Sequence, residues 1–548
     1  MKKTIKLLTL LFTAALATGC GGGNGGGGGE TSQGGGGGSP DYFEFEQSLL
    51  DTPQEIHTAD QKAYLSYNKG YYNITSQELN DFNATGNGQM TEWRPKQVTL
   101  KWDYEPPDGA TVSKYVLTFG QKPDLSDGYS VDGTSAKTIS FYNAFLGTNY
   151  FRITAKFTDG EQEESEIRTF QVEEECPRNL SVGNMPNCRD MGGRTTYAGG
   201  KIKQGLIYRT SGSGFASGQT PNDEAKDIFL NQMRVKTEIN VADGTGNNVN
   251  LNGVKVENCF MAYGAVPYSN LARNSVRIRQ VMNVLADENN YPLFYHCRIG
   301  TDRTGITGVM VGGLIGIEFN EILQDYGFSN FSPIDGQRYP HKSNDNNGDD
   351  IAKYIDAINE LPGETFQEKV YLALRLIGCP AAQLDKIIDI LTIGKKATIP
   401  ATAKIGADSD LTSSVSKTTA SDYKTPASYY TVPASGKVSF TTETTAGDKD
   451  VILYLGYTGS VTNGDTTSRL SNNLTLKIDG EEKTITSSKS LWTAGFGSTQ
   501  QDNRIGYMFN ILGNYAFTAG SHTIEIGVKE GSSSFNIATI GVADHASA

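Results

Sequence analysis

The stretch that decides the fold of this chain is His296-Cys297-Arg298-Ile299-Gly300-Thr301-Asp302-Arg303-Thr304-Gly305. It follows an apolar run, Tyr291 to Tyr295, and precedes an apolar pattern with helical spacing. We therefore expect a strand, a short loop and a helix. Such a loop points backbone N–H groups and a helix N-terminus at one spot, which suits a phosphate dianion.

The residue types in this stretch predict a nucleophile in an anion-binding loop. The helix N-terminus and Arg303 should lower the pKa of the Cys297 thiol below the ~8.5 of a free cysteine. Arg303 can bind two phosphate oxygens with its planar guanidinium group, and Thr304 can hydrogen-bond the sulfur. A buried structural cysteine beside a buried histidine is the alternative, but the agreement of seven positions favours catalysis. Substrate would contact Arg298, Ile299, Gly300, Thr301 and Arg303, while His296 and Gly305 support the loop.

The loop resembles the active-site signature of the cysteine-based phosphatases, the protein tyrosine phosphatase superfamily. Asp302 before Arg303 makes it similar to the bacterial tyrosine/phosphoinositide phosphatases, whose loop reads HCxAGKDRTG, and to the DRT of myotubularins. Three further stretches follow the order of that bacterial group within residues 176–395. They are Asn187–Gly193, which resembles NFRDLGG, Gly205–Ser211, which resembles GLLYRSG and contains Arg209, and Asp325–Asn330, which resembles DYLLSN.

Two departures from that group bear on the substrate and on the support of the loop. Thr301 replaces the lysine of the family's loop, which weakens the case for a highly anionic inositide substrate. Ile239-Asn240-Val241-Ala242 replaces the usual IDLR and removes an arginine that could have held the loop.

Two aspartates are candidates for the proton donor. The resemblance implies Asp302, whose side chain could lean over the pocket from its rim. Alternatively, Asp302 pairs with a basic neighbour and holds the loop's shape. In many tyrosine phosphatases the acid lies on a separate mobile loop, and Asp243 is the candidate for that arrangement.

The N-terminus predicts export and a lipid anchor. Lysines precede the apolar run Leu7 to Leu16, and Ala17-Thr18-Gly19-Cys20 resembles a bacterial lipoprotein box. We expect a signal peptide over 1–19, lipid on Cys20, and a glycine-rich tether over 20–40 that holds the protein on the extracytoplasmic side of a bacterial membrane. An ordinary cleaved signal with a chance cysteine is the alternative.

Cysteine usage and charge exclude several classes of partner. Cys176, Cys188, Cys259 and Cys379 could form disulfides in three pairings or remain free thiols. No CxxC pair or histidine-rich cluster predicts a metal, and no cofactor is expected. A net charge of −13 without a basic tract argues against nucleic acid.

The remaining chain divides by its residue pattern. Residues 41–89 have no assignable fold beyond a helix start at Thr75-Ser76-Gln77-Glu78. Residues 90–174 resemble a fibronectin type III β-sandwich, with Trp102 and Tyr150 in its core. An α/β tyrosine-phosphatase-like domain is expected over 175–396. Within it, the polar segment Ser332 to Asp350, with Arg338, is either a lid or, as the pattern favours, a solvated loop without a role.

Residues 397–548 resemble the jelly-roll sandwiches found as carbohydrate-binding modules. Trp492, Phe496 and Tyr507 could stack against a sugar, and core packing explains them equally well. The chain is thus expected to be an extracytoplasmic phosphatase acting on a phosphorylated protein or small phosphoester, with phosphotyrosine-type esters first and inositol phosphates second. The alternative is a surface lipoprotein that binds glycan or protein and carries a non-catalytic phosphatase-like domain.

Overall fold

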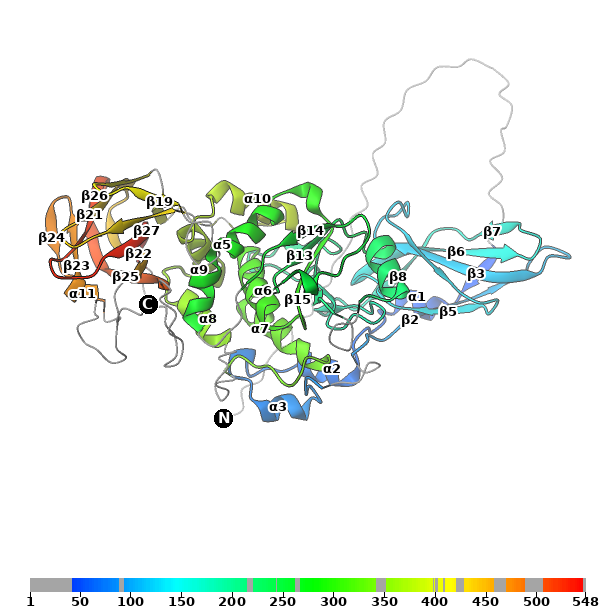
Figure 1. Cartoon of the computed structure of the whole chain (residues 1–548). Coiled ribbons are helices and arrows are strands. Elements are labelled where there is room, and N and C mark those ends of the chain that lie inside the picture. Colours follow the sequence, from blue (N-terminus) through cyan, green and yellow to red (C-terminus); the bar gives the residue numbers. More distant parts are fainter. Residues whose placement is uncertain are drawn as a thin grey trace, which may run out of the picture. The chain divides into compact units, whose positions relative to one another are not determined.

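The computed structural model describes residues 42–87, 93–213, 220–242, 244–261, 267–341, 351–397, 399, 403–407, 410–419, 428–457, 470–487 and 506–545. Within these ranges no helix is long and apolar enough to cross a bilayer. The fold combines an α/β part with β-sandwich parts before and after it in the sequence (Figure 1).

The first sandwich consists of two antiparallel sheets. One has the strand order β1-β2-β5, and the other has the order β4-β3-β6-β7 with β8 also paired to β6. Alternate residues along β2 are buried, as expected for strands with one face on a core. The strands are β1 (Phe43–Phe45), β2 (Val98–Tyr104), β3 (Val112–Gly120), β4 (Tyr129–Asp132), β5 (Thr138–Phe141), β6 (Gly147–Phe157), β7 (Gln162–Glu164) and β8 (Arg168–Val172).

The two aromatic residues assigned to this core differ in their burial. Trp102 is buried, as predicted, but Tyr150 is only half-buried, so the prediction for Tyr150 is wrong. The fully buried neighbour Asn149 instead fixes the turn before β6. Its side chain accepts a hydrogen bond from the Phe145 N–H at 2.9 Å and donates one to the Phe145 carbonyl at 2.7 Å. Because successive side chains of a strand point to opposite faces, the buried position of Asn149 puts Tyr150 on the other face of β6.

The segment before the sandwich joins two cores. Its first part, with β1 and helix α1 (Gln47–Asp51), places Phe43 and Leu50 in the sandwich core. Its second part packs against the α/β domain. It contains α2 (Ala59–Leu65), the 3₁₀ turn η1 (Tyr71–Asn73) and α3 (Ser76–Asp81). The predicted helix start is confirmed, because Thr75 and Glu78 form a reciprocal capping box at α3.

The α/β domain is built on a six-stranded sheet of order β14-β13-β15-β12-β10-β9. The first four strands are parallel to one another. Strand β10 pairs antiparallel with β12 on one side and with β9 on the other. The strands are β9 (Arg178–Asn179), β10 (Arg189–Asp190), β12 (Ile207–Ser211), β13 (Thr237–Asn240), β14 (Lys255–Asn258) and β15 (Leu293–Cys297), while β11 (Lys201–Ile202) pairs with β16 (Thr392–Ile393) in a separate ribbon. The strand predicted directly before the Cys297 loop is thereby confirmed as β15.

The central strand β15 is buried on both faces, as parallel strands usually are. Leu293, Tyr295 and Cys297 belong to the large core shared with the helices. Phe294 faces the opposite side and stacks on Phe229, with ring centroids 5.0 Å apart. The helices are α4 (Asp223–Asp227), the π-helical turn η2 (Ile228–Gln232), α5 (Pro267–Leu285), α6 (Asp302–Leu314), α7 (Phe319–Phe328), α8 (Ile351–Asn359), α9 (Phe366–Leu376) and α10 (Ala381–Leu391), with short 3₁₀ turns η3 (Thr245–Asn247), η4 (Glu288–Asn290) and η5 (Ser329–Phe331).

The C-terminal part is a second antiparallel sandwich with its own core. Its sheets have the orders β19-β20-β27-β22-β25, with β17 on β27, and β18-β21-β26-β23-β24. Trp492 and Phe496 lie outside the described residues, as does the side chain of Tyr507, so the sugar platform stays a prediction. The strands are β17 (Ala403–Ala407), β18 (Leu411–Ser413), β19 (Lys417–Thr419), β20 (Ser428–Val432), β21 (Lys437–Thr444), β22 (Gly447–Tyr457), β23 (Leu474–Ile478), β24 (Glu481–Lys483), β25 (Gly506–Phe517), β26 (Gly520–Val528) and β27 (Phe535–Asp544), with helix α11 (Leu470–Asn473) before β23.

Candidate active site

Cys297 is the last residue of β15, at the carboxyl end of the parallel strands. It lies opposite Ser211 of β12, and the residue before it lies opposite Asn240 of β13. The loop of residues 298–301 then turns directly into α6. Gly300 has φ +74°, and a Cβ there would come within 2.5 Å of the Thr210 carbonyl oxygen. The turn that brings the helix N-terminus beside Cys297 therefore requires glycine at this position.

The loop presents backbone N–H groups without protein acceptors. Among the described residues, none accepts a hydrogen bond from the N–H groups of Arg298, Ile299, Gly300 or Thr301. Buried N–H groups are rarely left without an acceptor, and Gly300 and Thr301 are buried. These groups precede the N-terminus of α6, where the helix dipole is positive. Arg303, on the first turn, is only 7% exposed and adds a guanidinium group to this end of the helix. The arrangement suits an anion.

The carbonyl side of the loop is held by two side chains. Asn187 donates hydrogen bonds to the carbonyl oxygens of Ile299 and Gly300, both at 3.0 Å. Arg209 Nη2 donates to the Gly300 oxygen at 2.8 Å. Because each carbonyl belongs to the same rigid peptide plane as the next N–H group, fixing these carbonyls also fixes the N–H groups of Gly300 and Thr301.

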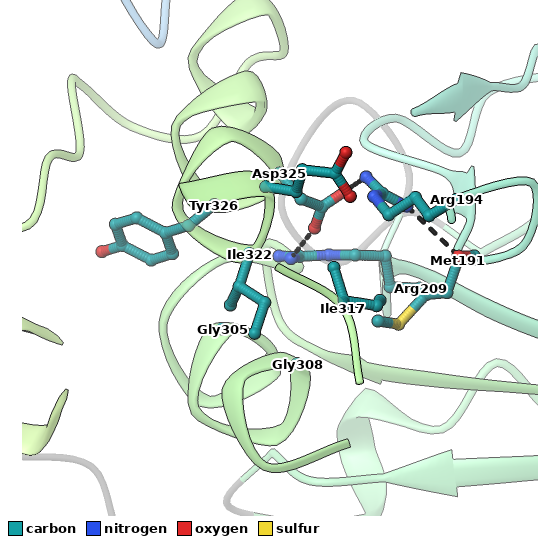
Figure 2. A pocket seen from close by; sticks show the side chains of 10 residues that line it. Met191, Arg194, Arg209, Gly305, Gly308, Ile317, Ile322, Asp325 and Tyr326 are labelled. Atoms are coloured by element: carbon teal, nitrogen blue, oxygen red, sulfur yellow. Dashed lines mark hydrogen bonds and ion pairs between the residues drawn. The ribbon is translucent and has the colours of Figure 1, made fainter. Parts of the chain in front are cut away.

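A buried carboxylate, Asp325 on α7, pairs with three arginines, two of which, Arg194 and Arg209, are drawn beside it in Figure 2. Its oxygens accept hydrogen bonds from Arg189 Nε at 3.0 Å, Arg194 Nη2 at 3.2 Å and Arg209 Nη1 at 2.5 Å. Burial alone would raise the pKa of Asp325, but the three guanidinium groups outweigh it and hold this pKa well below its usual range. The carboxylate is therefore ionised, and it orients the arginine that holds Gly300.

The cavity drawn in Figure 2 lies beside this ion cluster and is lined by Arg194, Arg209, Asp325 and Tyr326 among others. Its volume of about 10 Å³ is room for one water molecule. It is therefore part of the support of the loop and is too small for a phosphoester.

His296 and Glu238 form a second buried support. His296 Nε2 lies 2.9 Å from Glu238 Oε1, and both side chains are fully buried. Glu238 also accepts hydrogen bonds from the N–H groups of Val249 at 2.8 Å and Asn250 at 3.3 Å. This network fixes the end of β15 beside Cys297, and the functional role of His296 stays a prediction.

Residues 180–390 match the model of a family described as "Tyrosine phosphatase family". This part of the chain is thus similar to tyrosine phosphatase family domains. It contains the Cys297 loop and both of the supports beneath it. No curated protein matches the chain.

Several solved structures are similar to parts of the chain. The core catalytic domain of the PP-IP phosphatase SIW14 from S. cerevisiae has 18% identity and a TM-score of 0.20, covering 28% of this chain and 81% of its own. A CBM35 from Cellvibrio japonicus has 14% identity and a TM-score of 0.19, covering 26% of this chain and 94% of its own. A family 35 carbohydrate binding module from Clostridium thermocellum has 16% identity and a TM-score of 0.18, covering 26% of this chain and 99% of its own. TM-scores this low support no functional conclusion.

Thr304 contacts the main chain of the nucleophile and not its sulfur. Its Oγ1 accepts a hydrogen bond from the Cys297 N–H at 2.8 Å. The predicted bond to the sulfur is absent among the described contacts, in which the hydroxyl oxygen instead accepts from the peptide N–H of Cys297. Thr304 therefore ties the first turn of α6 to the end of β15. Gly305 lies on the same turn, where a Cβ would come within 2.8 Å of the Tyr326 ring.

Asp302 pairs with a basic residue from the segment predicted to be a solvated loop. Arg338 Nε donates to Asp302 Oδ1 at 3.1 Å, and the two side chains are 9% and 14% exposed. The prediction of a solvated segment without contacts is wrong for Arg338, because the ion pair and main-chain contacts bury it. The pairing is the one expected if Asp302 holds the loop's shape, and proton donation by Asp302 stays a prediction.

Asp243 lies outside the described residues.

The remaining substrate-loop side chains point to different environments. Thr301 is fully buried, and its Oγ1 accepts a hydrogen bond from Asn187 at 3.3 Å. Arg298 is half-exposed and pairs with Asp335 at 3.1 Å. The loop's only long cationic side chain besides Arg303 is therefore at the surface.

The four other cysteines in the described residues are free thiols. Burial raises the pKa of Cys176 to about 11 and the pKa values of Cys188, Cys259 and Cys379 to about 12. Of the two alternatives for these cysteines, disulfides or free thiols, the described residues therefore show free thiols. Cys20 lies outside the described residues.

Sequence reasoning did not assign roles to most of the supporting residues. Asn187, Arg189 and Asp325 were quoted within the family-like stretches, so the signal for them was present. The contacts of Arg194, Glu238 and Arg338 depend on segments far apart in the chain, and no local pattern indicates them.

Proposed function

We propose that this protein is a phosphatase that hydrolyses phosphate monoesters through a phosphocysteine on Cys297. The observation that carries the proposal is the order of groups after β15: Cys297 ends the strand, four residues follow whose N–H groups have no acceptor among the described residues, and the buried Arg303 lies on the first turn of α6. The family match over residues 180–390 supports it independently.

In the first step the Cys297 thiolate attacks phosphorus, and a bond forms between Sγ and phosphorus. The bond between phosphorus and the ester oxygen breaks, and its electron pair goes to the leaving alcohol. The N–H groups of the loop and Arg303 stabilise the charge on the other phosphate oxygens, since they are already oriented and need no rearrangement. An acid, proposed to be Asp302, gives its proton to the leaving oxygen.

In the second step water attacks phosphorus and the S–P bond breaks, which returns the thiolate. The carboxylate that gave its proton in the first step takes one from the attacking water. Inorganic phosphate leaves, so the cycle needs no metal-bound nucleophile from the residues described and no redox partner.

The surroundings of the loop support a substrate with one phosphate as the first choice. Thr301 occupies the position of the family's lysine and is buried, so it adds no charge to the pocket rim. We therefore place phosphotyrosine-type aryl esters before inositol phosphates. A panel of phosphopeptides and inositol phosphates tests this order, and activity confined to inositol phosphates would reverse it.

We further propose export and lipid attachment at Cys20, on the basis of the lysines, the apolar run and the glycine-rich tether. Labelling cells with a radioactive fatty acid tests the proposal. Label should enter the wild-type protein and be absent from Cys20→Ser. Equal labelling of both proteins would overturn it.

Turnover of para-nitrophenyl phosphate by the wild type and by Cys297→Ser tests the enzymatic proposal. Serine keeps the shape of the side chain but is a much weaker nucleophile at neutral pH. We expect turnover by the wild type only. If neither protein turns over any phosphoester of the panel, the alternative of a glycan- or protein-binding lipoprotein would be preferred.

A further inference from the structure

The helical segment α2 to α3 is built into the core of the phosphatase family domain. Tyr64, Tyr71 and Leu79 are buried in that domain's core cluster. The Tyr64 hydroxyl donates to the Gln324 carbonyl at 2.8 Å, and the Tyr71 N–H donates to Asn320 Oδ1 at 2.9 Å. Both acceptors lie on α7, the helix that carries Asp325. The family match begins only at residue 180, so this segment is an addition to the matched region.

The segment ends at Gly86, whose peptide groups pair with the chain that follows α7. The Gly86 N–H donates to the Asn330 carbonyl at 2.7 Å, and its carbonyl accepts from the Ile334 N–H at 2.9 Å. Gly86 is buried and has φ +73°. A Cβ there would come within 2.5 Å of the Gly336 carbonyl group, which is backbone and has no side chain to move. Only glycine fits this contact.

Gln337 joins the same two segments through its side chain. Its Nε2 donates to Asn80 Oδ1 and to the Ala84 carbonyl, both at 2.9 Å. Its Oε1 accepts from the Ser76 hydroxyl at 2.5 Å. The amide is thus held on both of its polar atoms by α3 and the chain after it.

The next residue, Arg338, connects these segments to Asp302, which follows the Cys297 loop. Its N–H donates to Asn330 Oδ1 and its carbonyl accepts from Asn330 Nδ2, both at 2.6 Å. The guanidinium group donates to the Gly336 carbonyl at 3.0 Å and to Asp302 Oδ1 at 3.1 Å. The hydrogen bonds of Arg338 fix both its backbone and its guanidinium group. Because the guanidinium group pairs with Asp302, the carboxylate of Asp302 is restricted as well.

We propose that residues 76–86 and 330–338 form a clamp that orients Asp302 for proton transfer, with Gly86, Gln337 and Arg338 as its positioning residues. The proposal rests on the proposed function, because it assigns a task to a residue of that same site. A carboxylate acting as acid must lie within hydrogen-bond reach of the leaving oxygen. Loosening the clamp should therefore slow the step that needs a proton and leave the attack by Cys297 nearly unchanged.

The test compares two esters, para-nitrophenyl phosphate, whose leaving group needs little protonation, and benzyl phosphate, whose alcohol needs a proton. The variants are Gly86→Ala, Gln337→Ala and Arg338→Gln. Gln337→Ala opens the clamp without introducing a clash and so serves if Gly86→Ala fails to fold. Each should lower kcat for benzyl phosphate by on the order of tenfold or more and kcat for para-nitrophenyl phosphate by less than roughly threefold. Arg338→Lys, which keeps the charge, should recover part of the lost benzyl phosphate activity.

Gly109→Ala is the matched control for the glycine. Gly109 has φ +82° and lies in the first sandwich, with nothing within 4 Å of the added Cβ. The Gly109→Ala substitution introduces a similar backbone strain but makes no contact with the clamp, so the rates with both esters should stay at the wild-type value. Because coupled residues are non-additive, Arg338→Gln should have no further effect on benzyl phosphate in an Asp302→Asn background.

Equal loss for both esters, or additive losses in the double variant, would overturn the clamp. Clamp variants that behave like Gly109→Ala would do so as well. Failure of the proposed function is a separate outcome, since the wild type would then turn over no phosphoester, or Cys297→Ser would hydrolyse para-nitrophenyl phosphate as fast as the wild type.

Discussion

Arg209 donates a hydrogen bond to the carbonyl oxygen of Gly300 at 2.8 Å, so strand β12 supports the turn of the catalytic loop directly. Asp325 orients that arginine from α7. Ala242, just after β13, stands where the related group has an arginine that could have held the loop. In this chain Arg209 on β12 holds the loop.

Asp325→Asn should strongly destabilise the phosphatase family domain. The amide would leave three buried guanidinium groups without their shared counter-ion, and breaking a buried pair costs about 3–5 kcal/mol. Denaturant unfolding at pH 7 measures the free-energy change. Asp335→Asn, which breaks the exposed pair with Arg298, is the control and should cost at most about 1 kcal/mol. Equal effects of the two substitutions would contradict the supporting role of Asp325.

Asp302→Asn should slow the hydrolysis of alkyl phosphates by on the order of 10²–10⁴. Aryl esters with good leaving groups should lose much less, because their oxygens leave without a proton. Steady-state rates over a series of leaving groups measure the difference. If Asp243→Asn gives that dependence and Asp302→Asn does not, the acid lies on the separate loop.

His57 should make the stability of the chain fall in mild acid. Burial lowers the pKa of His57 from 6.5 to about 4, and its ring contacts the Pro177 carbonyl at 2.9 Å. The unfolded chain therefore takes up a proton between these two pH values while the folded chain does not, so stability is lost as pH falls from about 6.5 to 4. His57→Gln should remove about 3 kcal/mol of that loss, measured by urea unfolding at pH 7 and pH 4. The same pH dependence in both proteins would refute the assignment.

Alkylation should separate Cys297 from the other thiols. Burial raises the pKa values of Cys188, Cys259 and Cys379 to about 12, so these groups are protonated at neutral pH. Iodoacetamide at pH 7 should label Cys297 first, as read by mass spectrometry of peptides, and inorganic phosphate should protect it. Peroxide should likewise inactivate the enzyme, and dithiothreitol should restore it. Activity indifferent to peroxide would mean that Cys297 is shielded from the oxidant or is not the nucleophile.

Local sequence predicted the parts of the site that lie close together in the chain. The strand, the short loop and the helix around Cys297 form as expected, because apolar runs on either side of the loop specify them over a few residues. The supports were not predicted. In the sequence, Arg338 is one cation among polar residues. Its burial depends on Gly86 and Asn330, which are far apart in the chain and come into contact only in the folded structure. The resemblance to a fibronectin type III sandwich predicts Tyr150 in the core. In the structure Asn149 takes the buried position through hydrogen bonds, which no pattern of apolar residues indicates.

Trapping of the covalent intermediate tests the central claim most directly. Enzyme mixed with radiolabelled aryl phosphate and quenched within one turnover should carry phosphate on the peptide that contains Cys297. Asp302→Asn should accumulate more of it, since the same carboxylate activates water in the second step, and Cys297→Ser should carry none. Turnover of the ester without label on Cys297, or turnover that persists in Cys297→Ser, would contradict the mechanism.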